Sequence, residues 1–313
     1  MGGGATGKSM LETPLPRLVV FGEALTDLLR QDDGVHWLAR PGGSPWNLAR
    51  VAARLGIATG FAGAVSRDVF GEEIRRQGAE AGLDARFLQE VDRSPLLAFV
   101  PSTRPPRYFF VGDDSADLHF ESDRLPRGWM DAAQVAHFGS ISLARAPLAG
   151  RLVDLAGRCH AAGVRITYDP NHRIAMGKEY GETFERMVRL ADLVKLSDED
   201  LARLVPGRPA GEALGVLRAW NPQALVLYTC GAAGMRLLTP TATHDRRAFR
   251  VTMVDPIGAG DACLGGWIAS WLTRPAAPPT VHLGFAAATA AAACEHAGAY
   301  APTREEVEAV LAR

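Results

Sequence analysis

Short apolar runs alternate with stretches of helical periodicity from Leu18 to the end of the chain. Several of these runs are apolar on both faces or rich in β-branched residues, as buried parallel strands are. The strand candidates are residues 18–21, 57–62, 135–138, 164–168, 193–196 and 224–229. Alternating strands and helices are typical of parallel strands joined by crossover helices. The pattern therefore predicts an α/β fold, with a mostly parallel central sheet and helices on both faces.

Three helices are visible in the pattern. One stops at the glycine terminator Gly56 and has apolar residues at helical spacing, namely Leu48, Val51, Ala52 and Leu55. The last helix of the chain begins with a capping box formed by Thr303 and Glu306. The nearly pure alanine stretch 286–294 predicts another helix, one able to pack closely against its neighbours.

Two segments, residues 31–41 and 95–120, break this rhythm and predict a small accessory β-sheet. The second contains aromatic residues without a helical period: Phe99, Tyr108, Phe109, Phe110 and Phe120. Open α/β sheets bind ligands at the carboxyl ends of their strands. The accessory sheet is therefore either a lid over such a site or a set of ordinary edge strands, and the pattern alone leaves both open.

Composition and charge narrow the partners. Of the 313 residues, 47% are hydrophobic and 22% are charged, which is enough to bury a large core, and the net charge is −1. No Lys/Arg block would follow a nucleic-acid backbone or an anionic membrane, and no apolar stretch reaches the roughly 18 residues that span a bilayer. We expect partners to be small molecules or copies of the chain itself.

The cysteines and the N-terminus add two expectations. Cys159, Cys230, Cys263 and Cys294 lack C-x-x-C spacing, which argues against a zinc site and a disulfide framework and favours a cytoplasmic protein. Residues 1–16 are rich in Gly and Pro, which predicts a flexible tail before a single domain over residues 17–313. The tail has the spacing of a phosphate-binding loop (Gly2, Gly7, Lys8, Ser9), but neither the strand nor the helix that this loop requires flanks it.

The segment from Asp255 to Gly266 contains the clearest chemical signal. A glycine turn, Gly258-Ala259-Gly260, leads directly into a helical pattern whose first turn contains Asp261. The unpaired N–H groups at a helix start and the positive end of its dipole favour negative charge. A carboxylate at this position is also a common helix cap. These residues alone allow Asp261 to be either a cap or a catalytic group beside an anion site.

This segment resembles the C-terminal signature of the ribokinase-like sugar kinases, the PfkB family, in which Asp-Thr-x-Gly-Ala-Gly-Asp is followed by Gly-Gly. The matching residues are Asp255, Gly258, Ala259, Gly260, Asp261, Gly265 and Gly266, while Pro256 and Cys263 depart from the pattern. The resemblance implies a ribokinase-like fold with a β lid, ATP and Mg²⁺ as cofactors, and K⁺ in some members. It also implies that Asp261 is the catalytic base and that the turn Gly258, Ala259 and Gly260 forms an anion hole. The donors we expect there are the backbone N–H groups of Ala259, Gly260 and Asp261.

Upstream motifs extend the resemblance to about residues 18–303. Gly42-Gly43 with Asn47 is similar to the family's N-terminal Gly-Gly-x-x-x-Asn signature, and Gly22-Glu23 with Asp27 resembles the opening of fructokinase-like members. Glycine allows close backbone approach, and an Asn side chain offers both a donor and an acceptor. The resemblance thus implies that sugar hydroxyls are bound by Asp27, Gly42, Gly43 and Asn47.

Three further motifs follow predicted strands. One is Asp169-Pro170-Asn171-His172-Arg173. By pattern alone this segment is an Asx turn. It also resembles the Asp-x-Asn-x-Arg of fructokinases and ketodeoxygluconate kinases, and this resemblance implies a substrate-binding Arg173 near the phosphates.

The other two motifs lie on the nucleotide side. Asp200 stands where many relatives have a Glu that organises water around Mg²⁺, and the Asp side chain is one methylene shorter than Glu. The resemblance implies that ATP is contacted by Lys195, Ser197, Thr229, Gly231, Gly234, Gly258 and Gly260. By pattern alone, these acidic and glycine residues are also ordinary helix-dipole complements and strand turns.

The predicted activity is ATP-dependent phosphorylation of a sugar primary hydroxyl, with fructose to fructose 6-phosphate first. Alternatives are 2-keto-3-deoxygluconate and other sugar or nucleoside substrates of PfkB kinases. Val111-Gly112 stands where fructokinase-like members have a Tyr-Arg lid pair, so we predict that the cationic lid contact to the sugar is missing. In relatives the accessory sheet is sometimes a dimer contact, which makes a homodimer through the lid an expectation here.

Two hypotheses from other classes remain to be tested against these. A non-catalytic sugar-binding protein on the kinase fold would not need the intact Gly-Ala-Gly-Asp sequence. A dinucleotide-binding dehydrogenase would need G-x-G-x-x-G after the first strand, where Gly22-Glu23-Ala24 stands instead.

Overall fold

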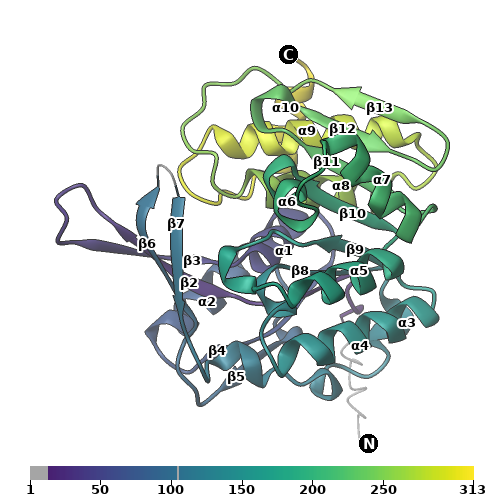
Figure 1. The fold of residues 1–313 in the computed structure, drawn as a ribbon. Helices are drawn as coiled ribbons and strands as arrows, with labels where there is room; N and C mark the ends of the chain where they lie inside the picture. The colour runs from purple at the N-terminus through teal and green to yellow at the C-terminus, as the bar shows by residue number, and fades with distance from the viewer. Residues whose placement is uncertain (1–12, 104–105) are drawn as a thin grey trace, which may run out of the picture.

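The computed structural model describes residues 13–103 and 106–313, so the Gly2–Ser9 motif lies outside the described residues. The main sheet has nine strands in the order β13 (Thr243–Arg246), β12 (Met235–Leu238), β11 (Leu225–Thr229), β10 (Leu193–Ser197), β9 (Arg165–Asp169), β8 (Val135–Gly139), β1 (Leu18–Phe21), β4 (Thr59–Ser66) and β5 (Leu88–Val91) (Figure 1). The seven strands from β11 to β5 in this order are parallel to one another. At the β11 edge, β12 runs antiparallel to β11, and β13 runs antiparallel to β12. The predicted mostly parallel sheet is confirmed.

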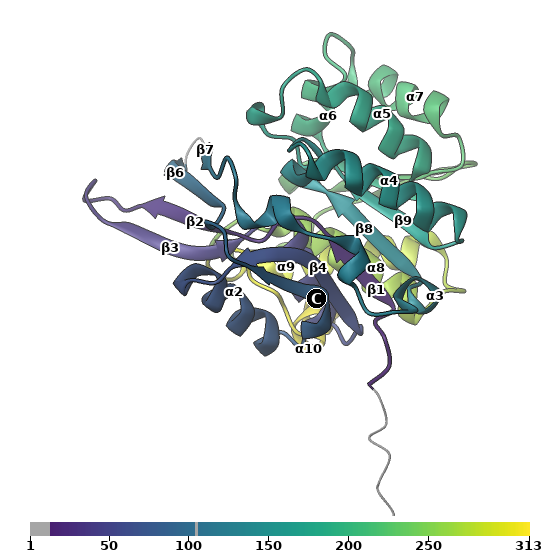
Figure 2. The same ribbon diagram turned by 90° about the horizontal axis from the view of Figure 1, so that it is seen from below.

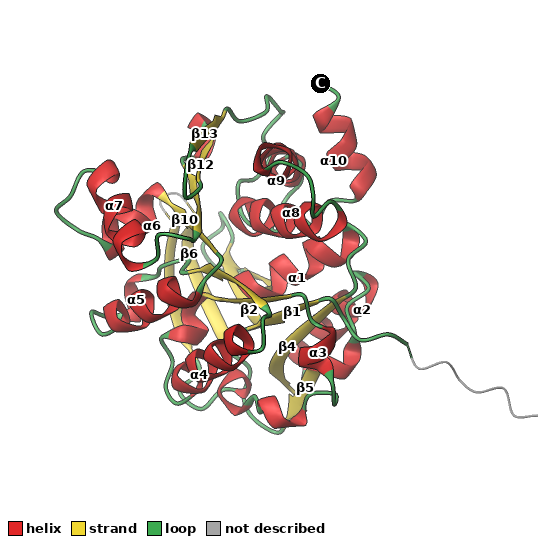
Figure 3. Cartoon of the chain, turned by 90° about the vertical axis from the view of Figure 1, so that its right-hand side faces the viewer, coloured by secondary structure: helices red, strands yellow, loops and turns green. Residues whose placement is uncertain are grey.

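Helices cover both faces of this sheet (Figure 3). One face is covered by α1 (Ser44–Arg54), α8 (Ala259–Thr273), α9 (Pro279–Cys294) and α10 (Arg304–Leu311). The other face is covered by α4 (Leu148–Ala161), α5 (Tyr180–Leu190), α6 (Asp198–Leu204) and α7 (Ala210–Trp220). Strand β1 explains why both faces need cover: Leu18 and Val20 pack on the α8 side, Val19 and Phe21 on the α4 side, and all four are fully buried.

A four-stranded second sheet, the lid, projects to one side of the main sheet (Figures 1 and 2). Its order is β3 (Trp37–Gly42), β2 (Leu25–Arg30), β6 (Leu97–Thr103) and β7 (Pro106–Val111). The pairing register puts Asp27, Ala98 and Phe110 on one face and Leu28, Phe99 and Phe109 on the other. The first face turns toward the carboxyl ends of the main strands.

The structure corrects the predicted lid boundaries. The first lid segment was predicted over residues 31–41, but its hairpin starts at Leu25, because the strand that carries Asp27 pairs with β3 across the turn at 31–36. The second segment leaves the lid after Val111. Residues 116–119 form a 3₁₀ turn, and the ring of Phe120 packs against Phe21 in the main core, with centroids 6.2 Å apart.

The other predicted elements lie close to those in the structure. Strand 18–21 is confirmed, whereas the strand predicted at 57–62 runs from Thr59 to Ser66, because Gly56 and Ile57 form the turn that follows α1 and small residues extend the strand. The capping box of α10 is present, with the Glu306 N–H donating to Thr303 Oγ1 at 3.3 Å. No helix within residues 13–103 and 106–313 is long and apolar enough to cross a membrane.

Candidate active site at the carboxyl edge of the sheet

The glycine turn before α8 is held in place from two directions. Gly258 has φ +77°, and a Cβ at this position would lie 2.8 Å from Ala299, so only glycine is accommodated without strain. Asp255 accepts hydrogen bonds from the N–H of Ile257 (3.0 Å) and of Gly298 (2.8 Å), which ties the turn to the segment after α9. The start of α8 is therefore a rigid feature.

The Asp261 carboxylate in the first turn of α8 is 8% exposed and is held by α1. Ser44 Oγ donates to Oδ1 at 2.6 Å, and Asn47 Nδ2 donates to Oδ2 at 2.9 Å. Burial raises the pKa of Asp261, while these hydrogen bonds and the charges of Lys195 and Arg173 act in the lowering direction. Both of these hydrogen bonds join the Asp261 side chain to α1 and neither joins it to the backbone of α8, which argues against the helix-cap alternative.

The N–H groups of the turn are not equivalent. The N–H of Ala259 donates to the Pro256 carbonyl at 3.2 Å, so it is already engaged within the protein. The N–H groups of Gly260 and Asp261 donate to no protein acceptor in the described part of the chain. The predicted three-donor anion hole of Ala259, Gly260 and Asp261 is thereby reduced to two free donors at the positive end of the α8 dipole.

A pocket of about 140 Å³ opens beside Asp261, between α1, the lid and the loops after β8 and β9. Its apolar wall includes Tyr108 and Phe110, so the accessory sheet borders this pocket. Four of the five predicted sugar-site residues line it, and the predicted catalytic residues Gly258 and Asp261 line it with them: the four are Asp27, Gly43, Asn47 and Arg173. Burial raises the pKa of Asp27 to about 6, against the lowering charge of Arg173.

The two glycines of the N-terminal signature support the pocket in different ways. Gly43 lines it with φ +105°, and a Cβ there would meet the Glu23 carbonyl at 2.6 Å. Gly42 does not line it. A Cβ at Gly42 would lie 2.1 Å from Asp27 Oδ2, so this glycine leaves room for the Asp27 carboxylate.

A cation reaches the pocket from the loop after β9. The Asn171 N–H donates to Asp169 Oδ1 at 3.0 Å, so the Asx turn is present, and it places Arg173 in the pocket with Cζ 5.4 Å from the centre of the Tyr108 ring. At the lid position itself, Gly112 leaves no space for a side chain, since a Cβ would lie 2.6 Å from Ser115 Oγ. Neither Val111 nor Gly112 lines the pocket, and its guanidinium is that of Arg173.

Sequence reasoning missed several residues of this pocket. Ser44 and Asn47 are three residues apart on α1, a spacing that puts both on one helix face and identifies Ser44 in retrospect. Glu23, quoted in the opening motif but given no role, lines the pocket and hydrogen-bonds to Ser142. Burial raises the pKa of Glu23 to about 7. Ser140, with the unusual φ of +59°, and Ile141 complete the wall and had no sequence signal.

Comparisons with known proteins agree with this geometry. The model of the pfkB family carbohydrate kinases matches residues 15–306. The chain belongs to the PfkB family of carbohydrate kinases. It is 31% identical over 258 residues to a fructokinase of Salmonella typhimurium, which covers 80% of this chain and 83% of that protein.

Two solved structures extend the likeness to the whole fold. A fructokinase with bound ATP from Xylella fastidiosa has a TM-score of 0.87 and 30% identity, covering 95% of this chain and 99% of that one. A Vibrio cholerae fructokinase with bound fructose, ADP and calcium ion has a TM-score of 0.83 and 27% identity, and the match covers 95% of this chain and 99% of that one. The chain is an ATP-dependent sugar kinase with a ribokinase-like fold.

The predicted nucleotide-side residues of the kinase lie at the ends of β10 and β11. Ser197 caps α6, and both oxygens of Asp200 accept hydrogen bonds from the protein: Oδ1 from the His172 N–H (2.9 Å), Oδ2 from the Ser197 N–H (3.0 Å) and Oγ (2.7 Å). Although burial acts in the raising direction, Lys195 and these hydrogen bonds lower the pKa of Asp200. Asp200 thus joins the loops after β9 and β10.

The glycine loop after Thr229 divides into an open and a packed half. Gly231, with φ +51°, has nothing within 4 Å of a Cβ position, so its surface is open to a ligand. Gly234 has φ +100° and packs against the chain, because a Cβ there would lie 2.2 Å from the Arg246 carbonyl. Close packing against the segment at Arg246 therefore explains why a glycine is needed at position 234.

Lys195 differs most from its predicted role. Its side chain is buried, 4% exposed, and Nζ donates to Asp169 Oδ2 at 2.8 Å.

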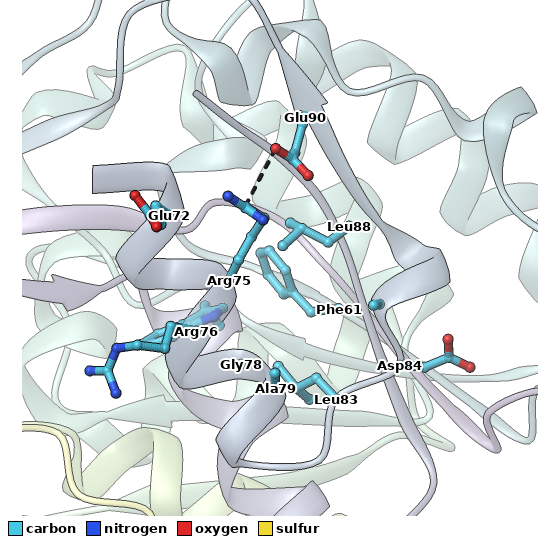
Figure 4. Close-up of a pocket in the computed structure, with 12 residues that line it drawn as sticks. Phe61, Glu72, Arg75, Arg76, Gly78, Ala79, Leu83, Asp84, Leu88 and Glu90 are labelled. Carbon is cyan, nitrogen blue, oxygen red and sulfur yellow. Dashed lines mark ion pairs between the residues drawn. The ribbon is translucent and has the colours of Figure 1, made fainter. Parts of the chain in front are cut away.

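A second pocket of about 430 Å³ lies between α2 (Val69–Glu80) and β5, away from these residues (Figure 4). Its floor includes Phe61 and Leu88, and Arg75 reaches across it to Glu90, with Nε 3.4 Å from Oε2. None of the predicted site residues lines this pocket, so the candidate active site is the pocket beside Asp261.

Proposed function

We propose that this kinase phosphorylates a neutral ketose on a primary hydroxyl, with fructose as the first substrate and fructose 6-phosphate as the product. The supporting observation is the charge of the pocket. Three carboxyl groups, those of Glu23, Asp27 and Asp261, line it together with the single guanidinium of Arg173. Carboxylates accept hydrogen bonds from sugar hydroxyls but repel an acidic substrate. This balance favours fructose over ketodeoxygluconate, in line with the fructokinases that the chain resembles.

In the proposed mechanism, Asp261 takes the proton of the attacking hydroxyl. The sugar oxygen forms a bond to the γ-phosphorus while the bond from this phosphorus to the bridging oxygen breaks, and ADP leaves with that electron pair. The free N–H groups of Gly260 and Asp261 stabilise the charge on the transferred group. Ser44 and Asn47 fix the carboxylate in one orientation, so positioning and charge stabilisation provide most of the rate.

We propose ATP and Mg²⁺ as the cofactors. Within the described residues, no cluster of three or more His, Cys, Asp or Glu side chains could hold a metal. Both Asp200 oxygens accept protein hydrogen bonds, so the residues suit an ion held by phosphate oxygens and water, with Asp200 organising that water. When bound, Mg²⁺ neutralises charge on the β- and γ-phosphates. A K⁺ ion near the anion hole stays a prediction, tested by comparing turnover in K⁺ and Na⁺ buffers.

The test is ADP formation with a matched panel of acceptors: fructose, other neutral ketoses, 2-keto-3-deoxygluconate and nucleosides. Fructose is expected to give the highest kcat/KM, and NMR of the product is expected to place the phosphate on C6. A preference for ketodeoxygluconate or a nucleoside would contradict the neutral-ketose proposal. Sugar binding by calorimetry without ADP formation from any acceptor would instead favour the non-catalytic sugar-binding protein.

Asp27→Asn is expected to raise the KM for fructose about tenfold or more with little change in kcat, because a charge-assisted hydrogen bond to the sugar is lost. The same change should stabilise the free protein at pH 7.5. The folded pKa of Asp27, about 6, lies above its ordinary 3.8, so ionisation costs stability above pH 6 and this cost disappears as pH falls toward 4. Steady-state kinetics and thermal unfolding at both pH values check these effects.

The control is Asp32→Asn, an exposed aspartate on the same lid hairpin. It should change neither KM nor the pH dependence of unfolding. An unchanged KM in Asp27→Asn would remove Asp27 from the sugar site.

We also propose a homodimer through the outer face of the lid and a cytoplasmic location. On that face, Phe99 and Phe109 stack with ring centres 4.7 Å apart, while Trp37 contacts Phe99 and Phe109 is 50% exposed. The four cysteines are free thiols, as in a reducing compartment. Sedimentation velocity at micromolar concentration tests the assembly, and a monomer mass would contradict the homodimer.

A further inference from the structure

The ammonium of Lys195 is buried beneath the first turn of α8. Leu193 packs in the core cluster on the α8 side and Val194 in the cluster on the α4 side, so strand alternation points Lys195 toward α8. A Cβ at Gly260 would lie 2.9 Å from Nζ. The absence of a side chain at Gly260 therefore allows the ammonium to approach the backbone of the turn that contains the two free N–H donors.

Lys195 has one hydrogen-bond partner in the described chain, Asp169, at 2.8 Å. Burial by itself would lower the pKa of Lys195, but the charges of Asp169, Asp200 and Asp261 outweigh it and raise this pKa. The ammonium is therefore positively charged across the working pH range. Asp169 is its counter-ion, and Asp261 is close enough to feel the charge.

Stability alone does not account for this pair. Removing two charges from water costs free energy that their attraction only partly returns, and apolar residues of similar size are often as stabilising. His137 illustrates the cost nearby: burial, followed by the charge of Lys195, lowers its pKa to about 3, so its ring is neutral. A cation retained at this depth, directly under the turn, indicates a role in the reaction.

We propose that Lys195 is a positioning residue for phosphoryl transfer, whose charge beneath Gly260 supports the ionised Asp261 and the negative charge that gathers at the turn during transfer. It acts through Asp261 and the turn and makes no contact with ATP. A fixed charge in a buried site stabilises developing charge without having to reorient during the reaction. The inference rests on the proposed function of Asp261 as the base.

The experiment compares two variants that both lose the ion pair, only one of which loses the cation. Asp169→Asn keeps Lys195, and Asn can still accept the Asn171 N–H through Oδ1. Lys195→Met with Asp169→Asn replaces the pair by neutral groups of similar size and leaves no unpaired buried charge. Thermal unfolding, kcat, the two KM values and the pH profile of kcat/KM are measured for both variants and the parent with fructose, ATP and Mg²⁺.

We expect the double variant to unfold at a higher temperature than Asp169→Asn, which leaves the Lys195 charge buried without its counter-ion. Despite this, the double variant should have a kcat about tenfold or more lower than Asp169→Asn, with the KM for ATP within about threefold. The acidic limb of its kcat/KM profile should move to higher pH, because the variant removes the Lys195 charge that lowers the pKa of Asp261. The other groups facing that carboxylate stay unchanged: Ser44, Asn47, Arg173 and Asp27.

Three results would overturn the proposal. A kcat equal to that of the parent in both variants would make the pair structural only. A raised KM for ATP with unchanged kcat would indicate direct nucleotide contact. A loss in Asp169→Asn as large as in the double variant would assign the effect to the ion-pair geometry. Two other results would contradict the proposed function itself and leave the role of Lys195 aside. They are a parent protein that forms no ADP, and an Asp261→Asn variant that keeps the full kcat of the parent.

Discussion

Asp261→Asn is expected to lower kcat by about 10²- to 10⁴-fold, the range over which a general base contributes, with a modest change in KM. The amide has nearly the shape of the carboxylate but cannot accept the proton of the sugar hydroxyl. The fold should tolerate it. Ser44 can still donate to Oδ1, and Asn47, whose own Oδ1 has no partner in the described structure, can turn its amide to accept from the new side chain.

The pH dependence gives this prediction a second readout. The base must be ionised, and burial raises the pKa of Asp261, so kcat/KM of the parent should fall as pH decreases through that raised pKa. The residual activity of the variant should lack this limb. The kcat/KM values of the parent and of Asp261→Asn are measured from pH 5 to 9 with fructose below its KM.

The matched control is Asp68→Ala. Asp68 is a true helix cap, whose side chain accepts from the N–H groups of Phe70 and Gly71, each at 3.0 Å. This change should cost about 1 kcal/mol of stability and leave kcat nearly unchanged. If Asp261→Asn behaved like Asp68→Ala, Asp261 would not be the base.

Gly258→Ala is the change with the next largest expected effect, a loss in kcat on the order of 10²-fold. The residue has φ +77°, and the new Cβ would lie 2.8 Å from Ala299, so the turn must move. Its N–H donors and Asp261 would move with it. A displacement of about 1 Å at a reacting centre is enough for a loss of this size.

Gly56→Ala separates the backbone strain from this displacement. Gly56 has a similar φ of +87° after α1, but no atom lies within 4 Å of its Cβ position. Both variants should lose about 1 kcal/mol of stability from left-handed backbone, and only Gly258→Ala should also lose kcat. Thermal unfolding and initial rates measured on the same preparations decide this. Equal rates in the two variants would show that the position of the turn does not limit transfer.

Local patterns predicted those parts of the site that are continuous in the chain. Arg173 lies only four residues after the end of β9, so a strand followed by an Asx turn was enough to place it at the carboxyl edge. Gly234 and Lys195 were assigned to ATP because motifs contain no information on burial. The structure explains the first by contact with Arg246 and the second by an ion pair with Asp169 inside the protein.

Patterns along the chain were enough to predict the parallel α/β architecture and the glycine turn followed by Asp261, because strand periodicity, helix periodicity and a helix start are properties of neighbouring residues. The surroundings of Asp261 could be seen only in the folded chain. Its hydrogen-bond donors Ser44 and Asn47 lie 217 and 214 positions away in the chain. The Pro256 carbonyl occupies one of the three expected donors, and Lys195 lies beneath the turn. These arrangements depend on packing α1, α8 and β10 together, and spacing along a chain does not encode such distances.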